Sequence, residues 1–175
     1  SYLGKAGQDE YAGLYEDDII KRGVISRIVK NKDIPTGTVI AFITPDSERT
    51  FVVHLGSAIT LTPEDLKEDY VKEAKIFHTT GYQLEDPNLK STVLKATDIA
   101  RKNNTLISID VADPELIRRN LDFLKGFIKE NADILFLNET EAQAFTGIED
   151  VEACLQNLEG YAETICLKIG EKGSI

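Results

Sequence analysis

Two acidic residues stand where apolar, strand-like runs of the sequence give way to turns. Glu85 follows Gln83-Leu84, and Asp110 closes the run that begins at Ser108. A carboxylate such as Glu85 can accept hydrogen bonds from the hydroxyls of a sugar-like ligand, although a solvated surface glutamate explains it slightly better. Asp110 can orient a metal-bound water or a ligand, or simply cap a turn. Both residues are therefore candidates for a binding site.

A third candidate is the segment Asn138-Glu139-Thr140-Glu141. Asn138 as the N-cap and Glu141 three residues later make a variant of the capping box, which predicts the start of a helix. A helix start also presents free backbone N–H groups to an anion. The two glutamates could hold a hydrated Mg²⁺ nearby, since Mg²⁺ prefers oxygen ligands and keeps several waters. Capping and metal binding are compatible roles.

A glycine pair marks the last candidate turn, Gly170-Glu171-Lys172-Gly173. This pattern favours a tight hairpin, and the glycines would also let backbone N–H groups approach a phosphate closely. The sequence has no Gly-x-x-x-x-Gly-Lys-Ser/Thr segment and no Gly-x-Gly-x-x-Gly that opens a helix after an early strand, so neither a P-loop enzyme nor a nicotinamide-binding Rossmann domain is supported.

Basic and imidazole side chains are less informative. Arg49 could reach a substrate or a phosphate, or form a surface ion pair with Glu48 or Asp46. His54 and His78 each stand alone in strand-like runs without a serine or cysteine nucleophile motif, so we expect both to have structural roles.

The elements that would position these residues follow from the pattern of the sequence. Thr62-Pro63, Asp86-Pro87 and Asp113-Pro114 each combine an N-cap with a proline at the first helical position. Apolar β-type runs alternate with these helix starts, at residues 76–79, 105–109, 134–137 and 164–167. This alternation predicts a parallel sheet with helices on both faces, in which ligands lie beyond the carboxyl ends of the strands.

The N-terminal third has a different texture. Residues Asp9 to Lys21 predict one amphipathic helix, and β-branched alternation predicts three short strands at 24–29, 38–43 and 50–55. The turn residues at 45–48 predict a hairpin between the last two strands. The architecture is therefore a parallel α/β core that carries a small β insertion.

Composition narrows the class of protein. With 42% hydrophobic residues among 175, the chain can bury a core, and disorder is a poor explanation. A formal charge of −10 argues against general binding to nucleic acid or to a membrane surface, but leaves an anionic ligand possible through amides or a metal. The sequence has neither a signal-peptide pattern nor an apolar run long enough to span a bilayer. Cys154 and Cys166 lack metal-like spacing, so we expect reduced thiols in a cytoplasmic protein.

Taken together and in order, these segments resemble the ribokinase-like (PfkB) family of sugar and nucleoside kinases. The segments that carry the resemblance are Leu3-Gly4-Lys5-Ala6-Gly7-Gln8-Asp9-Glu10-Tyr11, Pro35-Thr36-Gly37-Thr38, Pro45-Asp46-Ser47-Glu48-Arg49-Thr50, Gln83-Leu84-Glu85, Asn138-Glu139-Thr140-Glu141 and Lys168-Ile169-Gly170-Glu171-Lys172-Gly173. The resemblance implies a mostly parallel sheet flanked by helices, with a small β-sheet lid. In this chain it implies truncated core segments at 1–22 and 62–175 and a lid at 23–61.

The resemblance also implies a reaction, the transfer of the γ-phosphoryl group of ATP to a hydroxymethyl of a sugar or nucleoside. Glu85 and Arg49 would contact the substrate, Asn138, Gly170 and Gly173 the nucleotide, and Glu141 and, through water, Asp110 the Mg²⁺. Lys168 stands where many members carry threonine, and it could touch the nucleotide or be exposed. A lid would exclude water that competes for the phosphoryl group.

The sequence departs from the family at both ends. The Gly-Ala-Gly-Asp segment with the catalytic aspartate is absent and is expected beyond Ile175, and the N-terminal substrate elements are expected before Ser1. The chain has no methionine, even at position 1, which also suggests a piece of a longer protein. We therefore expect these 175 residues alone to be inactive as a kinase.

Three functions remain open. Glu85 favours a sugar acceptor, whereas the hairpin 45–50 resembles that of adenosine-kinase-like members, so a nucleoside is the alternative. A noncatalytic, kinase-like regulatory protein is the third. Exposed edges of lid strands allow a homodimer through the lid, and a monomer is also allowed.

Overall fold

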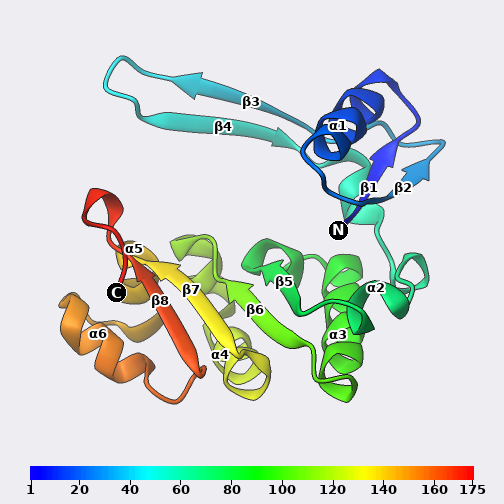
Figure 1. The fold of residues 1–175 in the computed structure, drawn as a ribbon. Helices are drawn as coiled ribbons and strands as arrows, with labels where there is room; N and C mark the ends of the chain where they lie inside the picture. The colour runs from blue at the N-terminus through cyan, green and yellow to red at the C-terminus, as the bar shows by residue number, and fades with distance from the viewer. The chain divides into compact units, whose positions relative to one another are not determined.

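The computed structural model describes residues 1–175, which form two compact units, Ser1–Leu66 and Lys67–Ile175 (Figure 1). None of the helices combines the length and the apolarity that crossing a bilayer requires.

The first unit begins with a strand–helix–strand motif. Strands β1 (Tyr2–Gly7) and β2 (Ser26–Asn31) are parallel neighbours, and helix α1 (Glu10–Lys21) connects them. The side chain of Asp9 caps α1 by accepting the N–H of Ala12 at 3.0 Å. The predicted helix is confirmed. Strand β1 was not predicted from the sequence, because its glycines Gly4 and Gly7 interrupt any apolar alternation.

A hairpin follows, formed by β3 (Thr38–Ile43) and β4 (Arg49–His54), which pair in antiparallel register from Thr38↔His54 to Ile43↔Arg49. This hairpin was predicted. Every residue of both strands is exposed, including Val39, Phe42 and Phe51. An isolated two-stranded hairpin is at best marginally stable in water. Because they are exposed, the apolar side chains of β3 and β4 are available for contacts with a ligand or another chain.

The base of the hairpin is tightly built. The carboxylate of Asp9 accepts both the N–H (2.8 Å) and the hydroxyl (2.6 Å) of Thr36. These hydrogen bonds lower the pKa of Asp9. Gly56 adopts φ +53°, and a Cβ there would lie 2.5 Å from the carbonyl oxygen of Pro35. The hydrogen bonds of Asp9 therefore anchor the hairpin to the start of α1, and the close contact between Gly56 and Pro35 joins the two flanks of the hairpin.

The second unit contains a four-stranded parallel sheet in the order β5 (Ile76–Thr80), β6 (Leu106–Asp110), β7 (Ile134–Asn138), β8 (Thr164–Lys168). All four strands were predicted. The helices are α2 (Asp69–Lys72), α3 (Pro87–Lys102), α4 (Pro114–Asn131), α5 (Glu139–Thr146) and α6 (Val151–Leu158). Asp86 and Asp113 cap α3 and α4 as predicted, whereas Pro63–Asp65 forms only a short 3₁₀ helix.

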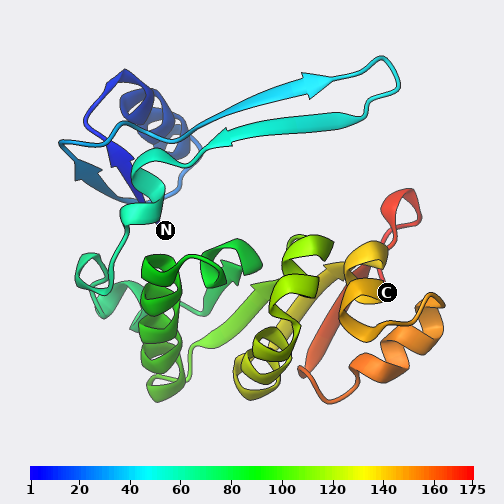
Figure 2. The same cartoon turned by 180° about the vertical axis from the view of Figure 1, so that it is seen from behind.

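The core lies between the sheet and the helices. Residues 107, 109, 135, 137 and 167 alternate along the strands and are fully or almost fully buried. Helices α3, α4 and α5 lie against this face, as Figure 2 shows. Alternation with a period of two therefore sends one set of side chains into the core.

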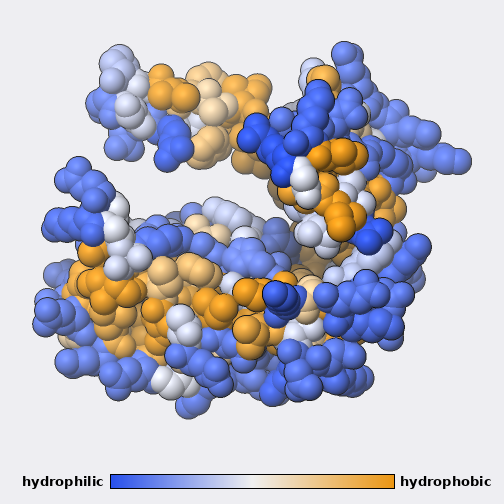
Figure 3. All heavy atoms as spheres, viewed as in Figure 1, coloured by the Kyte–Doolittle hydropathy of each residue, from blue (hydrophilic) through white to orange (hydrophobic).

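The prediction of helices on both faces is wrong for this chain. The other face of the sheet carries no helix (Figure 1), and apolar side chains gather on it in the space-filling view (Figure 3). Ile76 and Leu106 on this face remain 48% and 44% exposed. The bare face could not be predicted from the sequence. A strand with apolar residues on both sides predicts that both faces are buried, but it does not show which element covers each face.

The predicted division into a lid at 23–61 and core segments on either side remains a prediction. In the structure these residues share the first unit with β1 and α1, and the boundary between the units falls at Leu66.

Candidate functional site

The candidate site lies at the carboxyl edge of the four-stranded sheet. The strands end at Thr80, Asp110, Asn138 and Lys168, and the register pairs Thr80 with Asp110 and Asn138 with Lys168. Parallel strands end at the same edge, and this brings three of the predicted site residues together: Asp110, Asn138 and Lys168.

Asp110 and Lys168 form an ion pair. The ammonium of Lys168 donates to Oδ2 of Asp110 at 2.7 Å, and Oδ1 accepts the N–H of Ala112 at 3.0 Å. The two side chains are partly exposed, Lys168 more than Asp110. Lys168 had no definite role in the sequence analysis. In the structure its ammonium group contacts Asp110, the carboxylate predicted to bind Mg²⁺ through water.

Asn138 and Glu141 form the predicted capping box at the start of α5. Asn138 Oδ1 accepts the N–H of Glu141 at 2.9 Å, and Glu141 accepts the backbone N–H of Asn138 at 2.7 Å and its side-chain Nδ2 at 2.8 Å. The Glu141 side chain is buried. Burial raises its pKa; the N–H of Asn138 and the charge of Lys168 oppose this shift, and Asp110 and Asp113 add to it.

The carboxylates at this edge fit a hydrated cation better than a directly ligated one. The structure has no group of three or more His, Cys, Asp or Glu side chains arranged to hold a metal ion. Each oxygen of Glu141 accepts one hydrogen bond from Asn138 and so keeps one lone pair. Each oxygen of Asp110 likewise accepts one hydrogen bond. The remaining lone pairs of Asp110 and Glu141 suit an ion that keeps several of its own waters, as Mg²⁺ does.

The glycine turn after β8 is the predicted hairpin. Gly170 and Gly173 have φ of +60° and +98°, and the chain returns so that Leu167 and Ile175 exchange backbone hydrogen bonds of 2.8 and 2.9 Å. The N–H groups of Lys172 and Gly173 are used inside the turn. A phosphate at this turn would therefore not meet the N–H of Gly173 unless the turn rearranged.

Glu85 lies directly after the 3₁₀ helix Gly81–Leu84 that follows β5. Its carboxylate is engaged by Arg119 and Asn120 of α4. Sequence reasoning missed both partners, since they lie 34 and 35 residues away and no local pattern connects them to Glu85.

Arg49 is the first residue of β4 and is exposed. It belongs to the first unit, whereas every other predicted site residue belongs to the second. Its contact with a substrate therefore remains a prediction.

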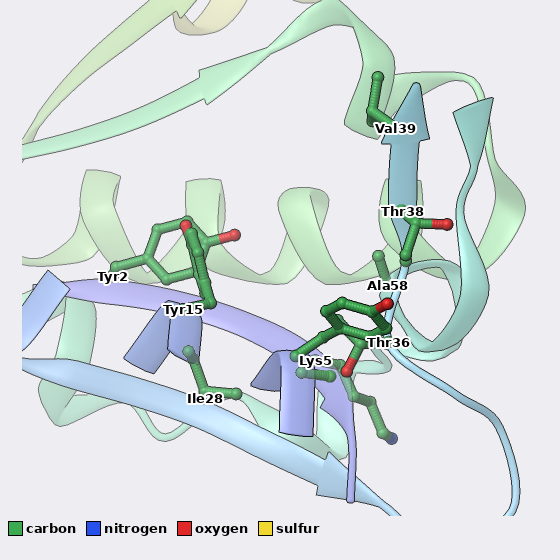
Figure 4. A pocket seen from close by; sticks show the side chains of 11 residues that line it. Tyr2, Lys5, Tyr15, Ile28, Thr36, Thr38, Val39 and Ala58 are labelled. Atoms are coloured by element: carbon green, nitrogen blue, oxygen red, sulfur yellow. The ribbon is translucent and has the colours of Figure 1, made fainter. Parts of the chain in front are cut away.

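The first unit has a pocket of its own, with a volume of about 410 Å³. Tyr2, Tyr15, Ile28, Thr36 and Thr38 are among its lining residues (Figure 4). The rings of Tyr2 and Tyr15 meet edge to face with centroids 5.7 Å apart. Burial and the hydrogen bond with Tyr15 raise the pKa of Tyr2 to about 12.

Comparison with known proteins places this architecture. The family model described as pfkB family carbohydrate kinase matches residues 1–175. Fructokinase-2 of Solanum lycopersicum is 26% identical, over 99% of this chain and 55% of its own length. The chain thus spans about half the length of the curated relatives it matches.

Solved structures agree. The adenosine kinase of Sinorhizobium meliloti superposes with a TM-score of 0.91 at 27% identity, covering 99% of this chain and 54% of that one. A putative ribokinase II from E. coli, solved with ATP and Mg²⁺, gives a TM-score of 0.84 at 22% identity, with coverage of 98% and 57%, and shows the fold alone. The predicted fold class is confirmed, and the chain belongs to the pfkB family of carbohydrate kinases.

Proposed function

We propose that the protein is an ATP-dependent kinase that transfers a γ-phosphoryl group to a hydroxymethyl of a sugar. The observation that carries the proposal is the grouping of Asp110, Asn138, Glu141 and Lys168 at the carboxyl edge of a sheet that belongs to this family. Carboxylates for a hydrated Mg²⁺ and a helix start for an anion are what phosphoryl transfer requires from such an edge.

In this proposal Glu141 and Asp110 hold Mg²⁺ through its waters, and Asn138 and Lys168 face the nucleotide. Gly170 and Gly173 lie beside it, in a turn that would have to rearrange before the N–H of Gly173 could bind a phosphate. Mg²⁺ would neutralise charge on the phosphates when it is bound. The lysine pairs with Asp110 at 2.7 Å, so it limits the negative charge at the edge where the phosphates would lie. Glu85 and Arg49 are proposed to contact the acceptor.

A nucleoside acceptor is the second candidate. The likeness to the S. meliloti adenosine kinase supports it, while the fructokinase relatives and Glu85 support a sugar. A noncatalytic regulatory role is the outcome that remains if neither substrate class is used. The exposed apolar hairpin supports a homodimer through β3 and β4.

Thermal-shift measurements on the native protein test the proposed ligands. A ligand present at about a hundred times its Kd stabilises the folded state by about 2.7 kcal/mol. MgATP together with one sugar should raise the melting temperature more than either alone. A shift with nucleosides only would favour the second candidate, and no shift with MgATP would contradict both. We also propose that residues 1–175 alone give no turnover.

A further inference from the structure

The carboxylate of Glu85 is held by a two-pronged contact from α4. Arg119 Nε donates to Oε1 at 3.0 Å, and Arg119 Nη2 lies 2.9 Å from Oε1 and 3.2 Å from Oε2. A guanidinium that meets both oxygens of a carboxylate fixes the plane of that carboxylate as well as its position. The Glu85 side chain therefore has a defined orientation although it lies at the surface.

The next residue of α4 adds a third donor. Asn120 Nδ2 lies 3.2 Å from Glu85 Oε1 and 3.0 Å from the carbonyl oxygen of Leu116. Asn120 is also the one residue inside α4 with non-helical angles, φ −124° and ψ 20°. The helix is thus kinked at the residue whose amide bridges Glu85 and the preceding turn.

Counting donors shows what Glu85 can still bind. A carboxylate offers about four acceptor positions. Arg119 Nε and Asn120 Nδ2 occupy both positions on Oε1, whereas Oε2 has only the 3.2 Å contact with Arg119 Nη2, which also lies 2.9 Å from Oε1. One position on Oε2 remains. Because Arg119 already balances the charge, that position suits a neutral hydroxyl better than a cation.

A purely structural purpose explains this arrangement poorly. The side chains of Arg119 and Glu85 are 57% and 39% exposed, and exposed ion pairs contribute little to stability, typically about 0–1 kcal/mol. What the contact does provide is a fixed direction for the remaining acceptor position of Glu85.

We propose that Arg119 and Asn120 are positioning residues that hold Glu85 as a hydrogen-bond acceptor for an uncharged hydroxyl of the substrate. The inference rests on the proposed function, since it needs a hydroxyl-bearing acceptor. It adds two residues outside the recognised motifs, Arg119 and Asn120, to the substrate site. It also specifies that the group bound by Glu85 is uncharged.

Steady-state kinetics of the native protein test the proposal with Arg119→Gln, Arg119→Lys and Glu85→Gln. The matched control is Arg118→Gln, because Arg118 pairs with Glu115 on the same helix and not with Glu85. Loss of one oriented hydrogen bond should raise the KM for the sugar or nucleoside about tenfold. Arg119→Gln should show this rise with kcat and the KM for ATP unchanged, Arg119→Lys a smaller rise, and Arg118→Gln none.

The double variant Glu85→Gln with Arg119→Gln separates positioning from general structure. If Arg119 acts through Glu85, the double variant has the same KM as Glu85→Gln alone. A further rise in the double variant, or a wild-type KM for Arg119→Gln, overturns the inference while leaving the proposed function intact. Absence of turnover by the wild-type protein with every sugar and nucleoside overturns the proposed function and this inference with it.

Discussion

The ammonium of Lys168 lies 2.7 Å from Oδ2 of Asp110, so the pair joins the ends of β8 and β6 across the end of β7. Replacing Lys168 by Met leaves that oxygen without its cation. Because the pair is partly exposed, we expect a loss of at most about 1 kcal/mol in the free energy of unfolding.

Urea unfolding of Lys168→Met, Asp110→Asn and the double variant measures this coupling, and Lys172→Met in the exposed turn is the control. The loss should shrink in high salt. Strictly additive effects of the two single changes would mean that the two side chains do not interact in solution.

Glu141 makes the stability of the protein depend on pH. Burial raises its pKa above the usual 4.5, so the folded protein binds this proton more tightly than the unfolded chain does. The resulting stabilisation is fully present below pH 4.5 and is lost as the pH rises through the folded-state pKa. Relative to Glu141→Gln, the wild type should therefore lose stability as the pH increases above 4.5.

Urea unfolding at a series of pH values, with a chelator present, measures that difference. Glu139→Gln is the control, because Glu139 lies in the same helical turn but is exposed. A difference between wild type and Glu141→Gln that does not change with pH would show that the folded state leaves the affinity of Glu141 for its proton unaltered.

Two glycines of the first unit should respond in opposite ways to alanine. Gly56→Ala places a Cβ 2.5 Å from the Pro35 carbonyl at a residue with φ +53°, so we expect a loss of more than about 2 kcal/mol. Gly13, in α1, has no atom within 4 Å of the added Cβ, and alanine there should stabilise the helix by about 0.5–1 kcal/mol. Melting temperatures measure both, and equal effects at the two positions would refute the anchoring of the hairpin base.

Glu85→Gln tests the proposed acceptor contact. The amide keeps the shape of the side chain but loses charge and one acceptor oxygen, so the KM for the preferred sugar should rise about tenfold. Glu115→Gln, an exposed change on α4, is the control. An unchanged KM and kcat in Glu85→Gln would remove Glu85 from the substrate site.

Local signals account for the parts of the fold that the sequence predicts. The caps at Asp86, Asp113 and Asn138 act within one helical turn, so they can be recognised without knowing the fold. The four core strands follow from continuous apolar runs. Strand β1 escapes because its stability depends on pairing with β2 rather than on its own glycine-rich sequence.

The side-chain partners at the site depend on tertiary structure and could not be predicted. Lys168 and Asp110 are 58 residues apart, and Arg119 and Glu85 are 34 apart. The sequence places Glu85, Asp110 and Lys168 near strand ends, but only the packing of α4 and the order of the strands determine which side chains they meet. The bare face of the sheet escapes prediction for the same reason.

Transfer of a phosphoryl group from ATP by this protein can be measured directly. ATP labelled in the γ-phosphoryl group is incubated with Mg²⁺, the native protein and, one at a time, a set of sugars and nucleosides. We predict Mg²⁺-dependent labelling of a sugar at a hydroxymethyl group. If the protein is folded and none of the sugars or nucleosides becomes labelled, the proposed kinase activity is contradicted.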